Sequence, residues 1–254
     1  MSTPLSAIII TLNEEKNIGR CLESISGVVD EIVVVDSFST DKTKEICAKY
    51  KAKFIEHPFE DFTKQKNFAL SQCSHDWVLS LDADEALDPV LRRNILELKK
   101  FPQKHGFKMH RVTNYCGKWI RHGGWYPDIK LRLIDKRYSR FEGGKVHEKL
   151  ITDQEVKMVG GEILHYSFYS IDQHQKQAND FSTHAANTLF EKGETTTVFR
   201  VLGAPVFSFF KNYFIKLGFL DGFYGLVIAV ISAQAKFLKY AKLLSLHLLK
   251  KQDS

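Results

Sequence analysis

An apolar run that ends in three carboxylates is the feature of this chain that most constrains its fold. Residues 77–81, Trp-Val-Leu-Ser-Leu, lead directly into Asp82, Ala83, Asp84 and Glu85. A run of this length with an acidic end is typical of a buried parallel strand rather than of a helix. Ligands of open α/β sheets bind at the carboxyl ends of such strands. We therefore expect Asp82 and Asp84 at the rim of a ligand-binding cleft.

These two carboxylates suggest a divalent cation. Asp82 and Asp84 are separated by one residue, so both would face the same side of an extended chain. Carboxylate oxygens are hard ligands that suit Mg²⁺ or Mn²⁺. A solvated acidic turn is the alternative interpretation, and for an isolated Asp-x-Asp it is the commoner one. The choice between the two therefore depends on the surrounding chain.

Strands and helices alternate through the first hundred residues. Apolar runs predict four strands, at residues 5–12, 31–36, 53–56 and 77–81. Short loops between alternating elements indicate βαβ units with right-handed crossovers. Polar side chains lie at the carboxyl ends of three of these strands. They are Asn13 and Glu14 after the first strand, Asp36 at the end of the second, and Asp82 and Asp84 after the fourth. This repetition favours a common binding site over unrelated surface charges at strand ends.

Length and charge limit the organisation of the chain. Its 254 residues are 44% hydrophobic, which suffices for one large core. We expect a catalytic domain over residues 1–200 and an appendage over residues 201–254. The net charge of +6 favours an anionic partner such as a nucleotide, a phospholipid surface or a nucleic acid.

Several classes of site are excluded by missing motifs. No Gly-x-Gly-x-x-Gly follows the first strand and no Gly-Lys-Ser/Thr occurs, which argues against dinucleotide-binding and P-loop folds. The four cysteines are widely spaced without a Cys-x-x-Cys pair, so they indicate reduced residues of a cytoplasmic protein rather than a zinc or redox motif. The first apolar run lacks a preceding basic region, unlike a signal peptide.

Taken together, these residues resemble glycosyltransferase family 2. The resemblance is carried by the strand that leads into Asn13-Glu14-Glu15, the strand that ends at Asp36, Gln65-Lys66-Asn67 and Asp82-Ala83-Asp84-Glu85. It implies a GT-A fold, a mostly parallel, Rossmann-like sheet flanked by helices, and an inverting, metal-dependent enzyme that uses a nucleotide sugar. Later motifs, among them Gly124-Trp125-Tyr126-Pro127 and Val146-His147-Glu148, are similar to the bacterial lipopolysaccharide core glucosyltransferases of this family.

The resemblance implies roles for the residues at the strand ends. Asp36 would bind the uracil, Asp82 the ribose, and Asp84 a Mg²⁺ or Mn²⁺ ion on the diphosphate. The remaining donor-site residues would be Asn13, Glu14, Lys66 and Asn67.

The catalytic base is the least determined residue. Inversion needs a proton acceptor near the acceptor hydroxyl, usually a carboxylate. Many family members supply it from an Asp in a Glu-Asp pair, and no such pair is evident after residue 100. Val146-His147-Glu148 stands where it would be expected, so Glu148 is our prediction for the base, with His147 as the rival base or metal ligand.

Three further residues are candidates for contacts with the acceptor or with phosphates. Trp125 lies in a loop rich in aromatic and glycine residues, where a ring could stack on a sugar face or belong to the core. Lys130 and Arg132 alternate along an expected strand, so they share one face and could meet either phosphates or solvent.

The chain changes character after Pro205. Aromatic residues crowd together and lysines punctuate the segment, which favours a helix that lies in the membrane interface. The uncharged stretch from Gly222 to Ala235 is shorter than the roughly 20 residues that span a bilayer. A helical hairpin packed on the catalytic domain and a dimer interface are the alternatives.

We therefore expect an enzyme on the inner face of the cytoplasmic membrane, acting on a lipid-linked glycan and not on nucleic acid. It would move a hexose, from UDP-glucose by preference, onto an inner-core heptose of lipopolysaccharide. Rival functions are transfer to polyprenyl phosphate or polysaccharide, nucleotidyl transfer with release of pyrophosphate, and non-catalytic binding of a sugar nucleotide.

Overall fold

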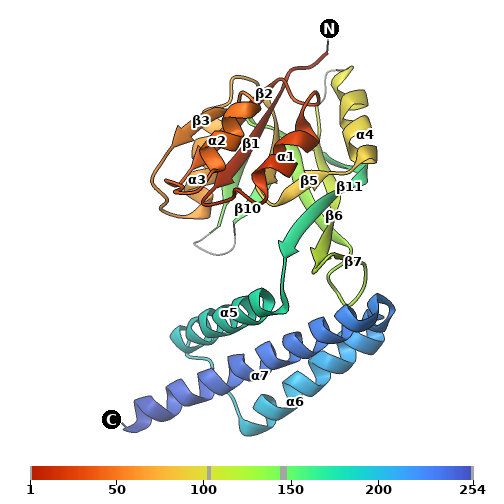
Figure 1. Cartoon of the computed structure of the whole chain (residues 1–254). Helices are drawn as coiled ribbons and strands as arrows, with labels where there is room; N and C mark the ends of the chain where they lie inside the picture. Colours follow the sequence, from red (N-terminus) through yellow and green to blue (C-terminus); the bar gives the residue numbers. More distant parts are fainter. Residues whose placement is uncertain (1, 102–103, 144–147, 253–254) are drawn as a thin grey trace. The chain divides into compact units, whose positions relative to one another are not determined.

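The computed structural model describes residues 2–101, 104–143 and 148–252, and it divides into two compact units (Figure 1). The first unit contains residues 1–112 and 128–166, and the second contains residues 113–127 and 167–254. This division falls elsewhere than the boundary expected at residue 200, because helix α5 (Ile171–Glu191) packs on the carboxyl-terminal helix. Where the catalytic region ends stays a prediction.

The first unit is built on a mixed sheet. Its parallel part consists of four strands in the order β3 (Lys53–Glu56), β2 (Glu31–Asp36), β1 (Leu5–Thr11) and β4 (Trp77–Asp82). Beyond β4 the order continues with β8 (Asp128–Asp135), β6 (Gly106–Tyr115), β11 (Val156–Phe168) and β5 (Glu85–Leu87). Strand β8 is antiparallel to both β4 and β6. The predicted Rossmann-like α/β class is confirmed.

The register of the parallel strands places their polar ends together. Thr11 of β1 pairs with Asp36 of β2, and Ile10 of β1 pairs with Asp82 of β4. Three chain segments that are distant in sequence therefore end at the same edge of the sheet, as the sequence predicted.

Helices cover both faces of this sheet. They are α1 (Ile18–Ile25), α2 (Thr43–Lys49), α3 (Phe62–Ser71) and α4 (Pro89–Lys99). At the start of helix α4 the Asp88 side chain accepts a hydrogen bond from the Leu91 amide at 2.6 Å, and Pro89 lies in the first turn.

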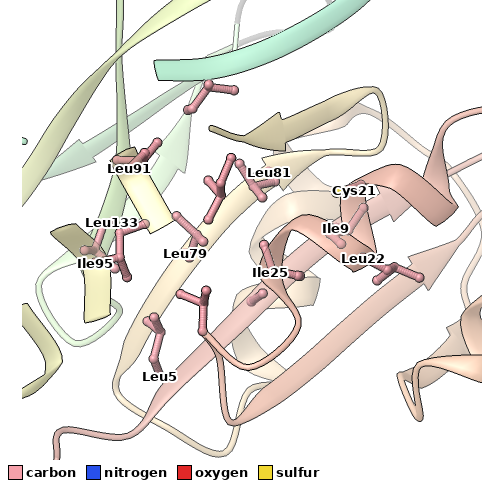
Figure 2. Close-up of a cluster of buried hydrophobic side chains, with 14 of the residues drawn as sticks. Leu5, Ile9, Cys21, Leu22, Ile25, Leu79, Leu81, Leu91, Ile95 and Leu133 are labelled. Atoms are coloured by element: carbon pink, nitrogen blue, oxygen red, sulfur yellow. The ribbon is translucent and has the colours of Figure 1, made fainter. Parts of the chain in front are cut away.

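The core is split by the alternation of side chains along the strands. Leu79 and Leu81 of β4 pack with Ile25 of α1 and Ile95 of α4 on one face (Figure 2). Val78 of β4 packs on the other face, in a cluster with residues of α3. Successive side chains of a strand point to opposite faces, so a continuous apolar run is what a sheet buried on both sides requires.

A small antiparallel ribbon completes the first unit. It consists of β9 (Ser139–Glu142) and β10 (Lys149–Thr152). Strand β9 contacts α3 and β10 contacts β8, so the ribbon holds Glu148, which directly precedes β10, beside the sheet.

The second unit is mainly helical. Strand β7 (Lys118–Ile120) pairs with residues 113–115 of β6. Helices α5 and α6 (Val198–Phe210) both pack along α7 (Gly222–Gln252), and Figure 1 shows α6 and α7 side by side. A π-helical turn (Lys211–Ile215) and a 3₁₀ turn (Gly218–Asp221) connect the last two helices.

The carboxyl-terminal helix is longer than the uncharged stretch within it. Helix α7 has 31 residues, and residues 218–250 are long and apolar enough, by length and composition alone, to cross a membrane. The uncharged stretch from Gly222 to Ala235 is thus only part of a longer apolar helix. Helix α7 continues beyond Ala235 through a segment that contains lysines.

Candidate active site

The polar strand ends border one cavity of about 450 Å³ in the first unit. Four acids line it, Glu14, Asp82, Asp84 and Glu148, together with Lys66 and His165. Apolar side chains of β1 and of the segment around Phe59 and Phe62 supply the rest of the lining. The structure thus brings together Glu14 and Asp82 from the predicted donor site, Asp84 from the predicted metal site and the predicted base Glu148.

Asp82 is held between two cations. Its Oδ1 lies 2.8 Å from Lys66 Nζ and its Oδ2 lies 2.7 Å from Arg132 Nη2. Burial raises the pKa of the Asp82 carboxyl, but the charges of Arg132 and Lys66 outweigh it and hold the pKa well below its usual value. Asp82 is therefore ionised and fixed in orientation.

Glu85, which the sequence did not single out as a site residue, holds Asp82 and Arg132 in position. Its fully buried side chain accepts a hydrogen bond from the Asp82 amide at 3.0 Å. It also pairs with Arg132 at 2.6 Å and with Arg111 at 3.0 Å. Arg132, a candidate for contact with either phosphates or solvent, is thus largely engaged by Asp82 and Glu85. A carboxylate three residues after Asp82 was the only local signal.

Asp84 lies beside a histidine from a distant strand. His165 Nε2 is 3.2 Å from Asp84 Oδ2, and Asp84 accepts a backbone hydrogen bond from Tyr166 at 2.8 Å. Sequence reasoning missed His165, because 81 positions separate the two residues and no spacing motif links them.

These two side chains fit a divalent cation only in part. Among the described residues, no group of three or more His, Cys, Asp or Glu side chains is arranged to hold a metal ion. Mg²⁺ is usually held by one or two carboxylates plus substrate phosphates and water. The donor set of Asp84 and His165 therefore fits an ion that is bound jointly with a diphosphate.

Glu14 and Asn13 connect the loops at the edge of the cavity. Burial raises the pKa of Glu14, and the neighbouring charges of Asp84, Asp41 and Asp82 add to the effect against a hydrogen bond from Asn17. Asn13 Oδ1 accepts a hydrogen bond from the Thr40 amide at 2.9 Å. Asn13 thereby ties the loop after β1 to the loop after β2.

Asp36 is more enclosed than its predicted role suggests. Its side chain is buried and accepts hydrogen bonds from Thr11 Oγ1 at 2.7 Å and from the Ser39 amide at 2.6 Å. In the described part of the chain, Asn13, Asp36 and Asn67 are not among the residues that line the cavity. Contact of Asp36 with a base stays a prediction.

Asn67 holds the small ribbon in place. Its amide nitrogen donates to the Phe141 carbonyl and its oxygen accepts from the Phe141 amide, both at 2.9 Å. Because both polar atoms are engaged by strand β9, Asn67 positions the segment that leads to Glu148.

Glu148 lies where a base for an acceptor could act. Its Oε1 is 3.1 Å from Lys66 Nζ, and its side chain is 23% exposed. Burial lowers the pKa of Lys66 while Asp82 and Glu148 raise it, and the net direction is upward. The rival base, His147, lies outside the described residues.

The other two acceptor candidates have different surroundings. Lys130 is half-buried and pairs with Asp128 at 3.1 Å. Trp125 belongs to the second unit, where its ring packs against Tyr115, Phe168 and His174 at centroid distances of 5.4 to 5.8 Å. A core role explains these ring contacts, and a role of Trp125 at the acceptor stays a prediction.

The comparison with known families decides the membership of the chain. The model of "Glycosyl transferase family 2" matches residues 6–154, which include every acid of the cavity. The chain belongs to glycosyltransferase family 2. The resemblance noted in the sequence is thereby confirmed, and the matched region ends just after strand β10.

Relatives of this family 2 protein match along nearly its whole length. It is 33% identical to the lipopolysaccharide core biosynthesis glycosyltransferase LpsC of Rhizobium meliloti, over 97% of this chain and 94% of that protein. It is 34% identical to an uncharacterized glycosyltransferase of Rickettsia typhi, over 96% and 88%. Glucosyl-3-phosphoglycerate synthase from Mycobacterium tuberculosis, solved with Mn²⁺ and UDP, matches 44% of each chain at 22% identity and a TM-score of 0.37. That likeness is too partial to bear on the reaction.

Proposed function

We propose that this family 2 enzyme transfers a hexose, with inversion, from a uridine diphosphate sugar to the core oligosaccharide of lipopolysaccharide. The observation that carries the proposal is the position of Glu148, which shares one cavity with the strand-end acids Glu14, Asp82 and Asp84. The 33% identity to LpsC over nearly the whole chain supports the acceptor class. Glucose and an inner-core heptose are the preferred sugar and acceptor.

Each residue of the cavity has its own role in the proposed reaction. Asp82, fixed by Lys66 and Arg132, accepts hydrogen bonds from ribose hydroxyls. Asp84 and His165 would hold a divalent cation, which would supply neutralisation of the negative charge on the diphosphate.

Glu148 takes the proton of the acceptor hydroxyl. As that proton moves to the carboxylate, the hydroxyl oxygen forms a bond to the anomeric carbon and the bond from this carbon to the diphosphate breaks. Lys66, paired with Glu148 at 3.1 Å, fixes the orientation of the carboxylate. The product is the glycoside of opposite anomeric configuration, and UDP leaves.

We also propose that the second unit binds the surface of the cytoplasmic membrane, where a lipid-linked acceptor resides. Several large apolar side chains of α6, α7 and their connection are exposed, among them Phe199 at 88%, Ile215 at 72% and Phe223 at 66%. An apolar surface of this kind with lysines nearby suits the interface of an anionic bilayer.

Incubation with a panel of sugar nucleotides and truncated core oligosaccharides tests the function. We expect one sugar to be transferred and a nucleoside diphosphate to be released. Release of pyrophosphate would instead indicate a nucleotidyltransferase. Binding of UDP without turnover on any acceptor would indicate a non-catalytic module, and transfer only to polyprenyl phosphate would move the acceptor class.

A further inference from the structure

A second cavity of about 440 Å³ adjoins the first in the same unit. Lys66, Asp82 and Glu148 line both cavities. The remaining lining of the second cavity comes from β6, β8, β10 and Phe141 of β9. Glu148 therefore lies at the border between two spaces, which is the place that a base between donor and acceptor must occupy.

The second cavity is rich in cations. Its lining contains Lys66, Lys108, Arg111, Lys130, Arg132 and Lys149. The acids available to them are Asp82 and Glu148 in the lining, and Glu85 and Asp128 behind it. Six positive groups thus face four carboxylates, and the surplus is positive.

The surplus sits on two exposed lysines. Arg111 and Lys130 pair with Asp128, at 2.7 and 3.1 Å. Lys108 of β6 and Lys149 of β10 are exposed and have no acid partner in the part of the chain that the structure describes. Arg132 adds a buried donor, since its Nε has no hydrogen-bond partner among the described residues.

The two cavities therefore differ in the ligand chemistry that they favour. The lining of the first cavity contains four acids together with the basic side chains Lys66 and His165. This excess of acids suits ligands with hydrogen-bond-donating hydroxyl groups, and it suits a cation. Ammonium and guanidinium groups that are held in place by β-strands make the second suitable for a phosphate or carboxylate.

We propose that the second cavity binds an anionic group on the acceptor sugar, either a phosphate ester or a carboxylate. This inference rests on the proposed function, because it assigns the acceptor side of the same site. Anchoring the anion against Lys108 and Lys149 places a nearby hydroxyl of the acceptor at Glu148. The enzyme then selects charged over neutral acceptors before the transfer step.

The diphosphate of the donor is the competing occupant. Asp84 and His165, the candidate ligands of the ion on that diphosphate, line the first cavity. A diphosphate shared with this ion belongs beside them, which leaves the cations of the second cavity for the acceptor.

Binding of small probes to the full-length protein tests the proposal without turnover. Mannose 6-phosphate and galacturonate are titrated by NMR and compared with neutral mannose and galactose. We expect the charged probes to bind and the neutral ones not to. The double variant Lys108→Ala/Lys149→Ala should weaken binding about tenfold, as expected for the loss of two partly solvated charge pairs.

The control is Lys49→Ala, which removes a positive charge from the exposed end of α2 and should leave binding of the probes unchanged. Binding of the phosphate probe alone would identify the group as a phosphate, and binding of both would extend it to carboxylates. Equal binding of charged and neutral probes, or no loss in the double variant, would overturn the proposal. Displacement of the probes by UDP with Mg²⁺ would assign the cavity to the donor instead.

Kinetics separates failure of this inference from failure of the proposed function. With a core oligosaccharide and its dephosphorylated, carboxyl-reduced form, the double variant should raise KM about tenfold for the charged acceptor only. The KM for the sugar nucleotide should stay unchanged. Transfer at equal efficiency to both acceptors would refute the anion site while upholding the transferase. Absence of transfer to every acceptor would refute the proposed function. The probe titration would still test whether the second cavity binds anions.

Discussion

Lys66 Nζ lies 3.1 Å from Glu148 Oε1, although 82 positions separate the two residues in the chain. The same nitrogen lies 2.8 Å from Asp82 Oδ1. A single buried ammonium, 6% exposed, thus joins the acid at the end of β4 to the acid proposed as the base. Removing it would leave two carboxylates close together without their common cation.

The first prediction concerns this ammonium. Lys66→Met should lower the free energy of unfolding by about 3 kcal/mol, because it breaks a buried ion pair and leaves Glu148 without this cation, while Asp82 keeps its pair with Arg132. Chemical denaturation followed by circular dichroism measures the loss. The matched control is Lys64→Met on the same helix, where an exposed pair with Glu60 is removed and little change is expected. Equal stability of both variants would contradict a structural role for Lys66.

The second prediction concerns the base. Glu148→Gln keeps the size of the side chain and removes its basicity, so sugar transfer should fall by about 10²–10⁴-fold. Affinity for the sugar nucleotide, measured by calorimetry, should stay nearly unchanged. If Glu148→Gln keeps near-normal turnover and His147→Ala loses it, the base is His147. If both variants stay active, the base lies elsewhere.

The third prediction concerns the metal. Chelation should abolish transfer, and added Mn²⁺ or Mg²⁺ should restore it. Asp84→Asn should lose at least about a hundredfold in kcat, by analogy with removal of one electrostatic stabiliser. Calorimetry of UDP binding with and without Mg²⁺ gives a readout apart from turnover, and Asp84→Asn should remove the difference. Full activity in chelator would exclude the metal assignment.

The fourth prediction uses the raised pKa of Glu14, whose usual value is 4.5. The pKa of Glu14 is higher in the folded protein than in the unfolded chain, so ionisation of this carboxyl destabilises the fold. The stability contributed by protonated Glu14 is fully present below pH 4.5 and is lost as the pH rises through the folded pKa. Glu14→Gln should therefore raise the Tm at pH 7 and lose this advantage below pH 4.5. It should also weaken binding of the donor.

A neighbouring acid supplies the control for this experiment. Glu15→Gln changes the same charge at an exposed position and should leave the Tm nearly unchanged at both pH values. An equal rise in Tm for the two variants would show that net charge, rather than burial of Glu14, is responsible.

The fifth prediction concerns membrane binding. The triple variant Phe199→Ser/Ile215→Ser/Phe223→Ser should lose flotation with anionic liposomes while keeping its circular dichroism spectrum, since all three side chains are exposed. High salt should weaken binding of the native chain by screening its lysines. The control, Phe101→Ser, removes an equally exposed ring, 67% accessible, from the first unit. Unchanged flotation of the triple variant would contradict the proposal that these side chains of the second unit bind the membrane.

Local patterns were sufficient to predict the framework of the first unit. The apolar runs that end at Thr11, Asp36 and Asp82 became adjacent parallel strands, because a short, fully apolar run is stable only when both faces are covered. Since parallel strands end at one edge of their sheet, the same runs also predicted that Glu14, Asp82 and Asp84 would meet. The family membership followed from these short segments as well.

Only the tertiary structure decided which cations meet these acids and where the base lies. Arg132 and Lys130 alternate on one strand, yet Arg132 is buried against Asp82 and Lys130 pairs with Asp128. Strand β8 runs antiparallel to β4, pairing Leu79 with Leu133, and this pairing over more than 50 residues carries Arg132 to Asp82. Periodicity records which face of a strand is apolar, but the register between distant strands is chosen by packing of the whole sheet. The contacts of Lys66 with Glu148 and of Asp84 with His165 therefore had no local signal.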